Sequence, residues 1–361
     1  MTTKLTSNLL FPSGSTPKSK GKAARSATPK MPKIPNLPKL IKDKIYKTGQ
    51  TRGADDDVIY QNRVGRNSTV LIPYAMWEKC CVPSEANSEY ENSYIVLISP
   101  EEYFGADNIE AELTSNGLAV GVNTLVFYET RAQWNAHNPD SLGWAEATRR
   151  RDPLGGNYVA RISATTSESG GKINRGFTTT AMKGAGIRVY EYADTETIAK
   201  CRLQLEALFW SCADSHEVAI SNGMTSEEAI LRKADNLQKC QDQNLYDFAQ
   251  LIEARMLNVA GNTVCPLCIS ELSSQGFFSR LDQAEGRIVH DLTVTQLNLF
   301  HIRELRFGGL NHLPYNLGWG HHHCNVVVKD SGIIETLHWM KEVVERNLIN
   351  GQLPMVSNNA S

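Results

Sequence analysis

The segments that decide the fold read CPLC at residues 265–268 and NLGWGHHHCN at residues 316–325. The two cysteines of the first segment are separated by two residues, a spacing that lets both sulfurs bind one cation. His321 and Cys324 repeat that spacing in the second segment and can supply the two remaining ligands of a tetrahedral site. We therefore expect a closed structural zinc site with three sulfur ligands and one nitrogen ligand. Its expected ligands are Cys265, Cys268, His321 and Cys324.

Two alternatives to this expectation stay open, one for the identity of the nitrogen ligand and one for the existence of the zinc site. His322 or His323 could take the place of His321, because the three histidines are adjacent. The cysteines could also be free thiols of a hydrophobic core, beside a surface cluster of histidines. Eight cysteines in 361 residues are modest usage, and in a reducing compartment a close cysteine pair is more typical of a metal site than of a disulfide.

Between these segments the chain reads LFHIRELRFGG at residues 299–309. A histidine followed by isoleucine, a Gly-Gly pair, an Asn-Leu pair and the second pair of zinc ligands follow one another along the chain, and a polar residue stands directly after the last cysteine. In this order and spacing they resemble the HNH, or ββα-metal, nuclease family. The resemblance covers about a fifth of the chain.

The resemblance implies a short hairpin followed by a helix, and a role for each of three residues. Hydrolysis of a phosphodiester needs a base that deprotonates water and a cation that neutralises charge on the phosphate. His301, at the end of the first strand, would be the base, because a neutral imidazole can take a proton near pH 7. Asn316 would fix the hairpin loop and so orient the base. Asn325, on the helix, would bind the catalytic cation, and its oxygen suits Mg²⁺.

One position departs from the family pattern. Many members carry Asp, Glu or His directly before the base as a second metal ligand, and here that residue is Phe300. Asp330 could compensate as a cation ligand, or Lys329 could contact phosphate. His312 is an alternative base, but it stands only four residues before Asn316, too close for the hairpin.

The remainder of the chain predicts an α+β fold. Short β-branched or aromatic runs bounded by turn residues predict strands and a mixed or mostly β region over about residues 50–193. These runs are residues 68–74, 93–98, 118–128 and 186–192. Apolar residues at helical spacing predict two long helices, at 197–216 and 225–258, the second capped by Thr225. A last helix at 331–348 carries one apolar face, which we expect to pack on the nuclease core.

These observations divide the chain into five segments. We expect a basic, disordered arm (1–43), a mixed DNA-recognition domain (44–193), a helical connector and dimerisation region (194–260), an HNH nuclease domain with zinc (261–350) and a tail (351–361).

Two basic segments suit nucleic acid. Residues 1–47 hold eleven Lys and Arg against one acid, Asp43, although the whole chain has a net charge of -2. Mobile basic arms attract polyanions, but such a segment can also be only a solubilising tail. The loop 149–188 adds cationic side chains suited to phosphate and guanine contacts, or simply a solvated surface. Its candidate DNA-binding residues are Arg149, Arg150, Arg151, Arg161, Lys172, Arg175, Lys183 and Arg188.

Composition excludes several classes of protein. At 41% hydrophobic residues the chain can bury a core, and no run approaches the ~18 apolar residues of a membrane-spanning helix. The N-terminus carries no apolar core followed by a cleavage site, so we expect a cytoplasmic protein.

The stretches 44–57 and 315–325 are similar to BstXI-type type II restriction endonucleases. That resemblance implies Mg²⁺-dependent double-strand cleavage at a specific site, a homodimer, and a cognate DNA methyltransferase in the same system. Two other functions stay open. One is a modification-dependent or other HNH DNA endonuclease, and the other is a non-catalytic, zinc-containing DNA-binding protein in which Phe300 marks an inactive site.

Overall fold

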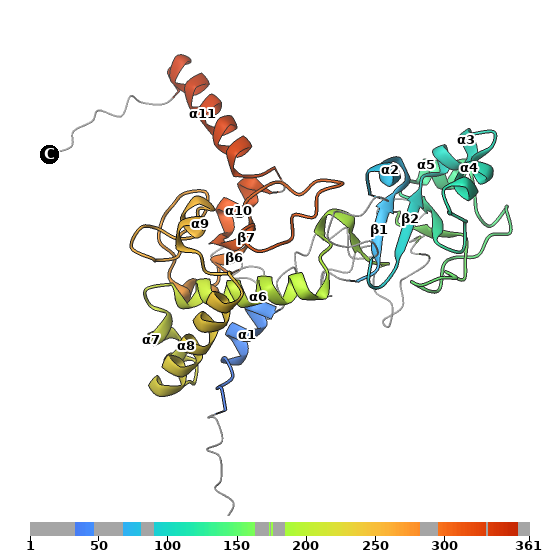
Figure 1. Cartoon of the computed structure of the whole chain (residues 1–361). Coiled ribbons are helices and arrows are strands. Elements are labelled where there is room, and N and C mark those ends of the chain that lie inside the picture. Colours follow the sequence, from blue (N-terminus) through green and yellow to red (C-terminus); the bar gives the residue numbers. More distant parts are fainter. Residues whose placement is uncertain are drawn as a thin grey trace, which may run out of the picture. The chain divides into compact units, whose positions relative to one another are not determined.

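The computed structural model describes residues 33–46, 68–80, 90–162, 173, 175, 185–281, 295–329 and 331–352. The described helices and strands all lie within one compact unit, Ile34–Ser361. Figure 1 shows these helices and strands.

A five-stranded parallel sheet with the order β4-β3-β2-β1-β5 lies in the first half of this unit. Its strands are β1 (Val70–Pro73), β2 (Tyr94–Ile98), β3 (Thr124–Tyr128), β4 (Tyr158–Ala160) and β5 (Ile187–Arg188). In β1, Val70, Leu71 and Ile72 are all buried, as are most residues of β2 and β3. Such continuous apolar runs are typical of parallel strands that are covered on both faces. Leu71 pairs with Ile95 of β2.

Short helices follow the strands. They are η1 (Tyr74–Met76), α2 (Trp77–Cys80), α3 (Pro100–Gly105), α4 (Ile109–Ser115), α5 (Arg131–Ala136) and η3 (Val189–Glu191). Ser99 and Glu102 form a capping box at the start of α3, and Thr130 and Gln133 do the same for α5. Four of the five strands were predicted at the right places and β4 was not, and of the two expectations for this region the mixed one is confirmed and the mostly β one was wrong. Parallel strands need crossover connections, and here helices of four to seven residues serve in them, too short to show helical periodicity in sequence.

The two long helices predicted after the sheet are each divided. The first becomes α6 (Thr195–Trp210) and α7 (Ser215–Ser221), and the second becomes α8 (Ser226–Asp242) and α9 (Phe248–Glu253). Asn244 adopts the left-handed conformation (φ 55°) just after α8, and the Leu245 amide donates back to the Cys240 carbonyl at 2.7 Å. The N-cap predicted at Thr225 is confirmed, because its hydroxyl accepts from the Glu228 amide in a capping box.

The chain before the sheet also differs from expectation. Part of the segment expected to be a disordered arm forms α1 (Lys39–Tyr46), which contacts α6. Leu37, Ile41 and Ile45 recur every four residues and are buried in the core that α6 shares with the C-terminal half of the chain. Leu37 lies two residues before the helix, and Ile41 and Ile45 lie on one face of it, so the helix is held by packing.

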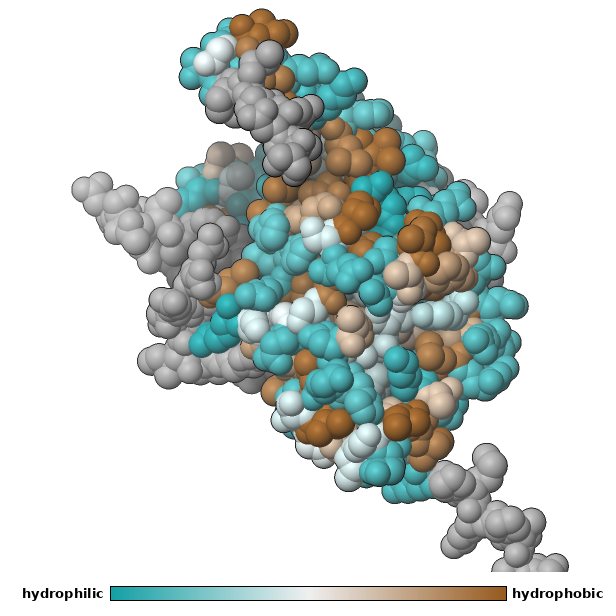
Figure 2. Space-filling view, turned by 90° about the vertical axis from the view of Figure 1, so that its left-hand side faces the viewer, coloured by the Kyte–Doolittle hydropathy of each residue, from teal (hydrophilic) through white to brown (hydrophobic). Residues whose placement is uncertain are grey.

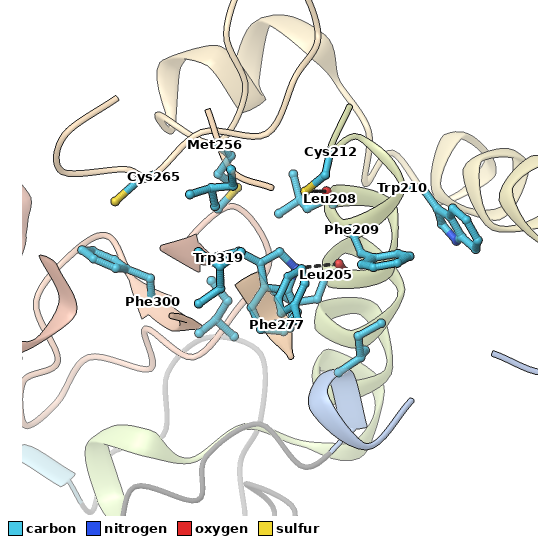
Figure 3. Close-up of a cluster of buried hydrophobic side chains, with 14 of the residues drawn as sticks. Leu205, Leu208, Phe209, Trp210, Cys212, Met256, Cys265, Phe277, Phe300 and Trp319 are labelled. Atoms are coloured by element: carbon cyan, nitrogen blue, oxygen red, sulfur yellow. Dashed lines mark hydrogen bonds between the residues drawn. The ribbon is translucent and has the colours of Figure 1, made fainter. Parts of the chain in front are cut away.

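The core beside α6 is aromatic, as Figure 3 shows. Trp319 of strand β7 (Leu317–His321) is 1% exposed, and its indole Nε1 donates to the Leu205 carbonyl of α6 at 2.9 Å. Phe277, in η4 (Ser274–Phe277), stacks edge-on against Trp319 with ring centroids 4.8 Å apart. Burial of these rings and a satisfied indole N–H fix β7 against α6.

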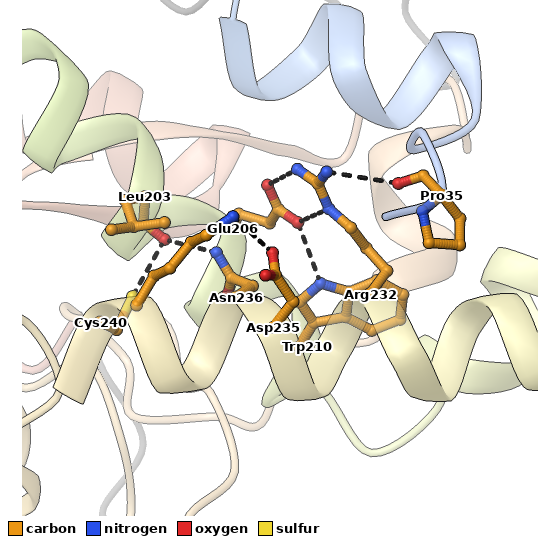
Figure 4. Close-up of polar contacts among 9 residues, drawn as sticks. Pro35, Leu203, Glu206, Trp210, Arg232, Asp235, Asn236 and Cys240 are labelled. Carbon is orange, nitrogen blue, oxygen red and sulfur yellow. Dashed lines mark hydrogen bonds and ion pairs between the residues drawn. The ribbon is translucent and has the colours of Figure 1, made fainter. Parts of the chain in front are cut away.

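A buried ion pair joins α6 to α8, as Figure 4 shows. Glu206 is 1% exposed and accepts from Arg232 Nε at 2.6 Å and Nη2 at 2.7 Å. Trp210 donates to the same carboxylate at 3.3 Å, and Arg232 Nη1 donates to the Pro35 carbonyl at 3.3 Å. With both charges paired and hydrogen-bonded, the pair fixes the relative positions of α6, α8 and the segment before α1.

The last helix, α11 (Ile333–Ile349), forms where expected but packs differently. Its buried residues are Ile333 and Thr336, both near its start. Met340, Val344 and Leu348 are 37%, 47% and 42% exposed. Leu337 also packs against the core, so the prediction that this apolar face packs on the nuclease core was wrong only beyond Leu337. Figure 2 shows brown, hydrophobic residues among teal ones on the upper part of one face, the height at which α11 lies in Figure 1.

Candidate functional site: a hairpin, a helix and a cysteine-histidine cluster

The candidate site is built on a two-stranded antiparallel hairpin that runs directly into a helix. Strand β6 (Leu297–His301) pairs with β7, so that Leu297 faces His321 and His301 faces Leu317. Helix α10 (His322–Val328) starts at the residue after β7 and contacts both strands. The described chain therefore contains a β-β-α unit over residues 297–328, although the long loop inside it joins the strands without regular structure.

The four predicted zinc ligands come together at one end of this unit. The ligand atoms of Cys265, Cys268, His321 and Cys324 all lie within 4.8 Å of one another. Cys268 Sγ lies 3.4 Å from His321 Nδ1. The first pair is held by a tight turn, in which the Ile269 amide donates to the Cys265 carbonyl at 2.8 Å. The two ligand pairs have the same spacing in the sequence, and the fold brings them to the same place.

The donor set fits zinc. Three thiol sulfurs and one imidazole nitrogen are a common ligand set of structural zinc sites. Burial and then the neighbouring thiols of Cys265 and Cys268 raise the pKa of Cys324, which disfavours the thiolate form of Cys324. A divalent cation reverses that preference, because it stabilises the thiolate form.

Of the three adjacent histidines, His321 is the one whose ring nitrogen lies in the cluster. His323 is exposed and stacks on the His321 ring, with centroids 5.2 Å apart. His322 turns to the hairpin instead, where its Nδ1 accepts from Asn298 Nδ2 at 2.8 Å.

His301 ends β6 and is half-buried. Its Nε2 lies 3.2 Å from Nδ1 of His312, within hydrogen-bond distance. His312 is 4% exposed and comes from the loop between β6 and β7. The two histidines that the sequence offered as alternative bases are thus a contacting pair.

Asn316 is fully buried at the end of the same loop and bonds to both of its sides. Its Oδ1 accepts from the Arg303 amide at 2.7 Å, and its Nδ2 donates to the Asn311 carbonyl at 2.6 Å. The Ile302 amide donates to the Asn316 carbonyl at 3.0 Å. These contacts fix the chain on the residues directly after His301.

The residues proposed for the catalytic cation are only partly described. Asn325 lies on α10 and is half-buried, whereas Asp330 lies outside the described residues. Phe300 is fully buried, with its ring against Gly320, so it occupies a packing position. Lys329 is exposed at the end of α10. For a hard cation, these described residues offer one side-chain oxygen, that of Asn325, and phosphate oxygens or water would have to complete the shell.

Lys44 is part of the site's support and was not singled out from the sequence. Its ammonium, on α1 and 6% exposed, donates to Thr295 Oγ1 at 2.5 Å and to Asn298 Oδ1 at 2.9 Å. Because Asn298 Oδ1 accepts from Lys44, the orientation of the Asn298 amide is fixed and its Nδ2 is the atom that faces His322. Burial and then the charge of Lys44 lower the pKa of His322. The helical spacing of Leu37, Ile41 and Ile45 was a signal for α1, but its contact with β6 depends on tertiary packing.

The candidate DNA-binding residues do not form one loop, because β4 and β5 lie among them. The Arg150 carbonyl accepts from Thr69, just before β1, which places its backbone at the amino ends of the parallel strands. The Arg161 amide donates to the Tyr128 carbonyl at the opposite, carboxyl ends. Arg175 pairs with Asp140 and lies 4.9 Å above the Trp134 ring.

Exposure also differs among these basic residues. Arg149 and Arg151 are exposed, and Arg188 is half-buried on β5. Lys172 and Lys183 lie outside the described residues.

Comparisons with known proteins place this chain in a family. No curated protein matches it. A solved structure titled "Crystal structure of a type II restriction endonuclease" aligns with 15% identity and a TM-score of 0.25, over 45% of this chain and 56% of that chain. This chain thus matches little more than half of that chain's length. None of the described helices is long and apolar enough to cross a membrane. The BstXI restriction endonuclease family model matches residues 43–322, which is most of the chain. The chain therefore belongs to the BstXI restriction endonuclease family.

Proposed function

We propose that this chain cleaves both strands of DNA at a specific site, by an HNH-type reaction at the β6-β7-α10 unit. The observation that carries the proposal is that one β-β-α unit holds His301 at a strand end, Asn316 in the loop and Asn325 on the helix. His301 and Asn316 lie within the part of the chain matched by the restriction endonuclease family. Family membership supports the substrate, and the unit supports the chemistry.

His301 acts as the general base. It is half-buried, so one side of the ring is fixed by packing while water can still approach it. Its imidazole takes a proton from the attacking water, and the resulting hydroxide attacks the phosphorus of the scissile phosphodiester. Asn316 keeps the segment after His301 in place, so the base does not have to be ordered in each turnover.

Two metals are part of the proposal. Asn325, with help from Asp330, would hold Mg²⁺, which when bound neutralises charge on the phosphate. Cys265, Cys268, His321 and Cys324 would hold a structural Zn²⁺, because the closed set of four protein ligands leaves no position for substrate. Zinc would tie the start of α10 to the turn at residues 265–268.

The partners follow from the reaction. One nuclease unit cuts one strand, so double-strand cleavage at a symmetric site favours a homodimer. Contacts to DNA are proposed for the exposed Arg149 and Arg151, while Arg175 is already engaged with Asp140 and Trp134. A cytoplasmic endonuclease of this kind requires a cognate methyltransferase that protects the host sequence.

A second function is favoured by one observation, the burial of Phe300 where many HNH nucleases carry a metal ligand. A protein without that ligand could bind DNA through a zinc-stabilised fold and not cut it.

Digestion of a sequenced plasmid separates the two functions. The purified chain is incubated with Mg²⁺, with EDTA, and with EDTA followed by excess Mg²⁺, on unmodified and on methylated plasmid, and the product ends are sequenced. We expect discrete fragments that share one sequence, lost with EDTA and restored by Mg²⁺. Binding without cutting under all these conditions would instead establish the DNA-binding protein, and cutting of methylated plasmid alone would establish a modification-dependent enzyme.

A further inference from the structure

We propose that His312 is a positioning residue for the base His301, which it holds in one tautomer and supports once that base is protonated. This inference rests on the proposed nuclease function. The observation is the 3.2 Å contact between His301 Nε2 and His312 Nδ1. The two rings are tilted by 53° with centroids 5.4 Å apart, so they meet at their edges and are not stacked.

The chemistry of two imidazoles fixes which ring donates. After His301 has taken a proton from water, its imidazolium carries a proton on both nitrogens and can only donate from Nε2. His312 Nδ1 is then the acceptor, so His312 carries its own proton on Nε2. We infer the same direction before the transfer, with the proton of neutral His301 on Nε2 and Nδ1 as the basic nitrogen. The proton therefore moves from water to Nδ1 of His301, and the contact with His312 is kept throughout.

This arrangement follows the logic of a catalytic triad, in which a third group orients the base and stabilises its protonated form. His312 supplies a neutral acceptor in place of a carboxylate. Its effect on the base is accordingly smaller than that of an anion, but it selects the tautomer in the same way.

The loop around His312 is held tightly enough for this role. Asn316 Nδ2 donates to the carbonyl of Asn311 at 2.6 Å, and the Asn316 amide donates to the carbonyl of Leu313 at 3.2 Å. Asn316 thus binds both chain neighbours of His312. The Cys201 thiol of α6 also lies 4.0 Å from the His312 carbonyl. Asn316 therefore reaches the base by two routes, directly through the chain after His301 and indirectly through His312.

Burial distinguishes the roles of the two rings. His312 is 4% exposed whereas His301 is half-buried, so His301 is the ring that a water molecule and a phosphate can approach. His312 is the supporting ring.

The first test measures cleavage rate and DNA binding separately for two substitutions of His312. Asparagine places an amide near the position of Nδ1 and can keep the bond to His301, whereas leucine cannot. We expect H312L to lower kcat by about 10- to 100-fold, which is no more than the lower end of the roughly 10²- to 10⁴-fold contribution of a general base, with DNA affinity nearly unchanged. H312N should retain most of the wild-type kcat. H338L, at an exposed histidine on α11, is the control and should cleave like the wild type.

A double substitution shows whether His312 acts through His301. The variant H301A/H312L should cleave no more slowly than H301A alone, because the supporting residue has nothing left to support. Additive losses would overturn the proposal. If H301A itself cleaves like the wild type, the proposed base is wrong, which is a different result.

A spectroscopic measurement covers the case in which H312L does not fold. Imidazole ¹⁵N shifts of the histidine-labelled wild type, assigned by H301A, report which nitrogen of His301 carries the proton. A proton on Nε2 supports the proposal, and a proton on Nδ1 in the neutral ring overturns it.

Discussion

Residue-scale packing in β7 explains why this strand carries a glycine at position 320. A Cβ on Gly320 would overlap the ring of Phe300 on the paired strand, whereas a Cβ on Gly318 would meet Met256 at an ordinary 3.5 Å. Phe300 stands where the proposed HNH motif would carry a metal ligand, and Gly320 makes room for its ring. The sequence motif showed the missing ligand, but only the strand register shows what replaced it.

Alanine at these two positions should therefore have unequal effects. G320A forces Phe300 or the strand to move, and overpacking of this kind costs about 1–3 kcal/mol of unfolding free energy. G318A should cost less. Thermal or urea unfolding of both variants compares them, and equal losses would contradict the packing described for Phe300.

The surroundings of Asp214 indicate how the free energy of unfolding depends on pH. Burial raises the pKa of its carboxyl group, but hydrogen bonds from Ser273, Ser274 and Gln275 outweigh burial and lower that pKa below the ordinary value of 3.8. A group with a lowered folded-state pKa contributes stability that is present above its unfolded value and is lost as pH falls through the folded value. D214N should therefore be less stable than the wild type at pH 6, with the difference narrowing below about pH 3.8. D107N, at an exposed aspartate, is the control. A difference that stays constant with pH would exclude this linkage.

At the scale of elements, sequence periodicity located apolar segments better than it located their ends. Strands β1, β2, β3 and β5 were predictable because they lie in short runs rich in β-branched or aromatic residues, whereas the three-residue β4 was not predicted. Thr225 was predictable because a capping box is local. The break between α8 and α9 was not predictable from the sequence. It depends on the left-handed conformation of Asn244 and on the hydrogen bond from the Leu245 amide to the Cys240 carbonyl. The direction of the strands also lies outside local sequence.

Helix α11 shows the same limit, since an amphipathic pattern does not say what covers its apolar face. Replacing Met340 or Val344 by lysine should change the unfolding free energy by less than about 0.5 kcal/mol, as for surface positions. I333A removes a buried side chain and should cost about 2–5 kcal/mol. Chemical denaturation of the three variants measures this. A loss at Val344 as large as at Ile333 would mean that the exposed face is packed in solution.

At the scale of the whole molecule, the site combines predictable and unpredictable parts. The proposed zinc ligands and the order of His301, Asn316 and Asn325 follow from spacing, because each ligand pair is local and the motif lies within about 60 residues. Lys44 and its bond to Asn298 join residues 254 positions apart, so no local pattern reveals them. The His301–His312 contact depends on the path of a loop without regular structure.

The zinc proposal is tested on the intact chain. Metal analysis should give one zinc per chain for the wild type and less for C268A, and C268A should lose the cooperative unfolding of the part that contains Trp319, seen by its fluorescence. C80A removes a cysteine outside the cluster and should retain its zinc. A folded C268A variant with full zinc content would refute the assignment.

The most direct measurement of the central claim compares wild type, H301A and H338A for cleavage and for binding of the same cognate DNA. Substitution of a general base should lower the cleavage rate by about 10²- to 10⁴-fold, with DNA affinity nearly unchanged and H338A equal to the wild type. Cleavage by H301A at the wild-type rate would contradict the account, because the nuclease centre would then lie elsewhere in the chain.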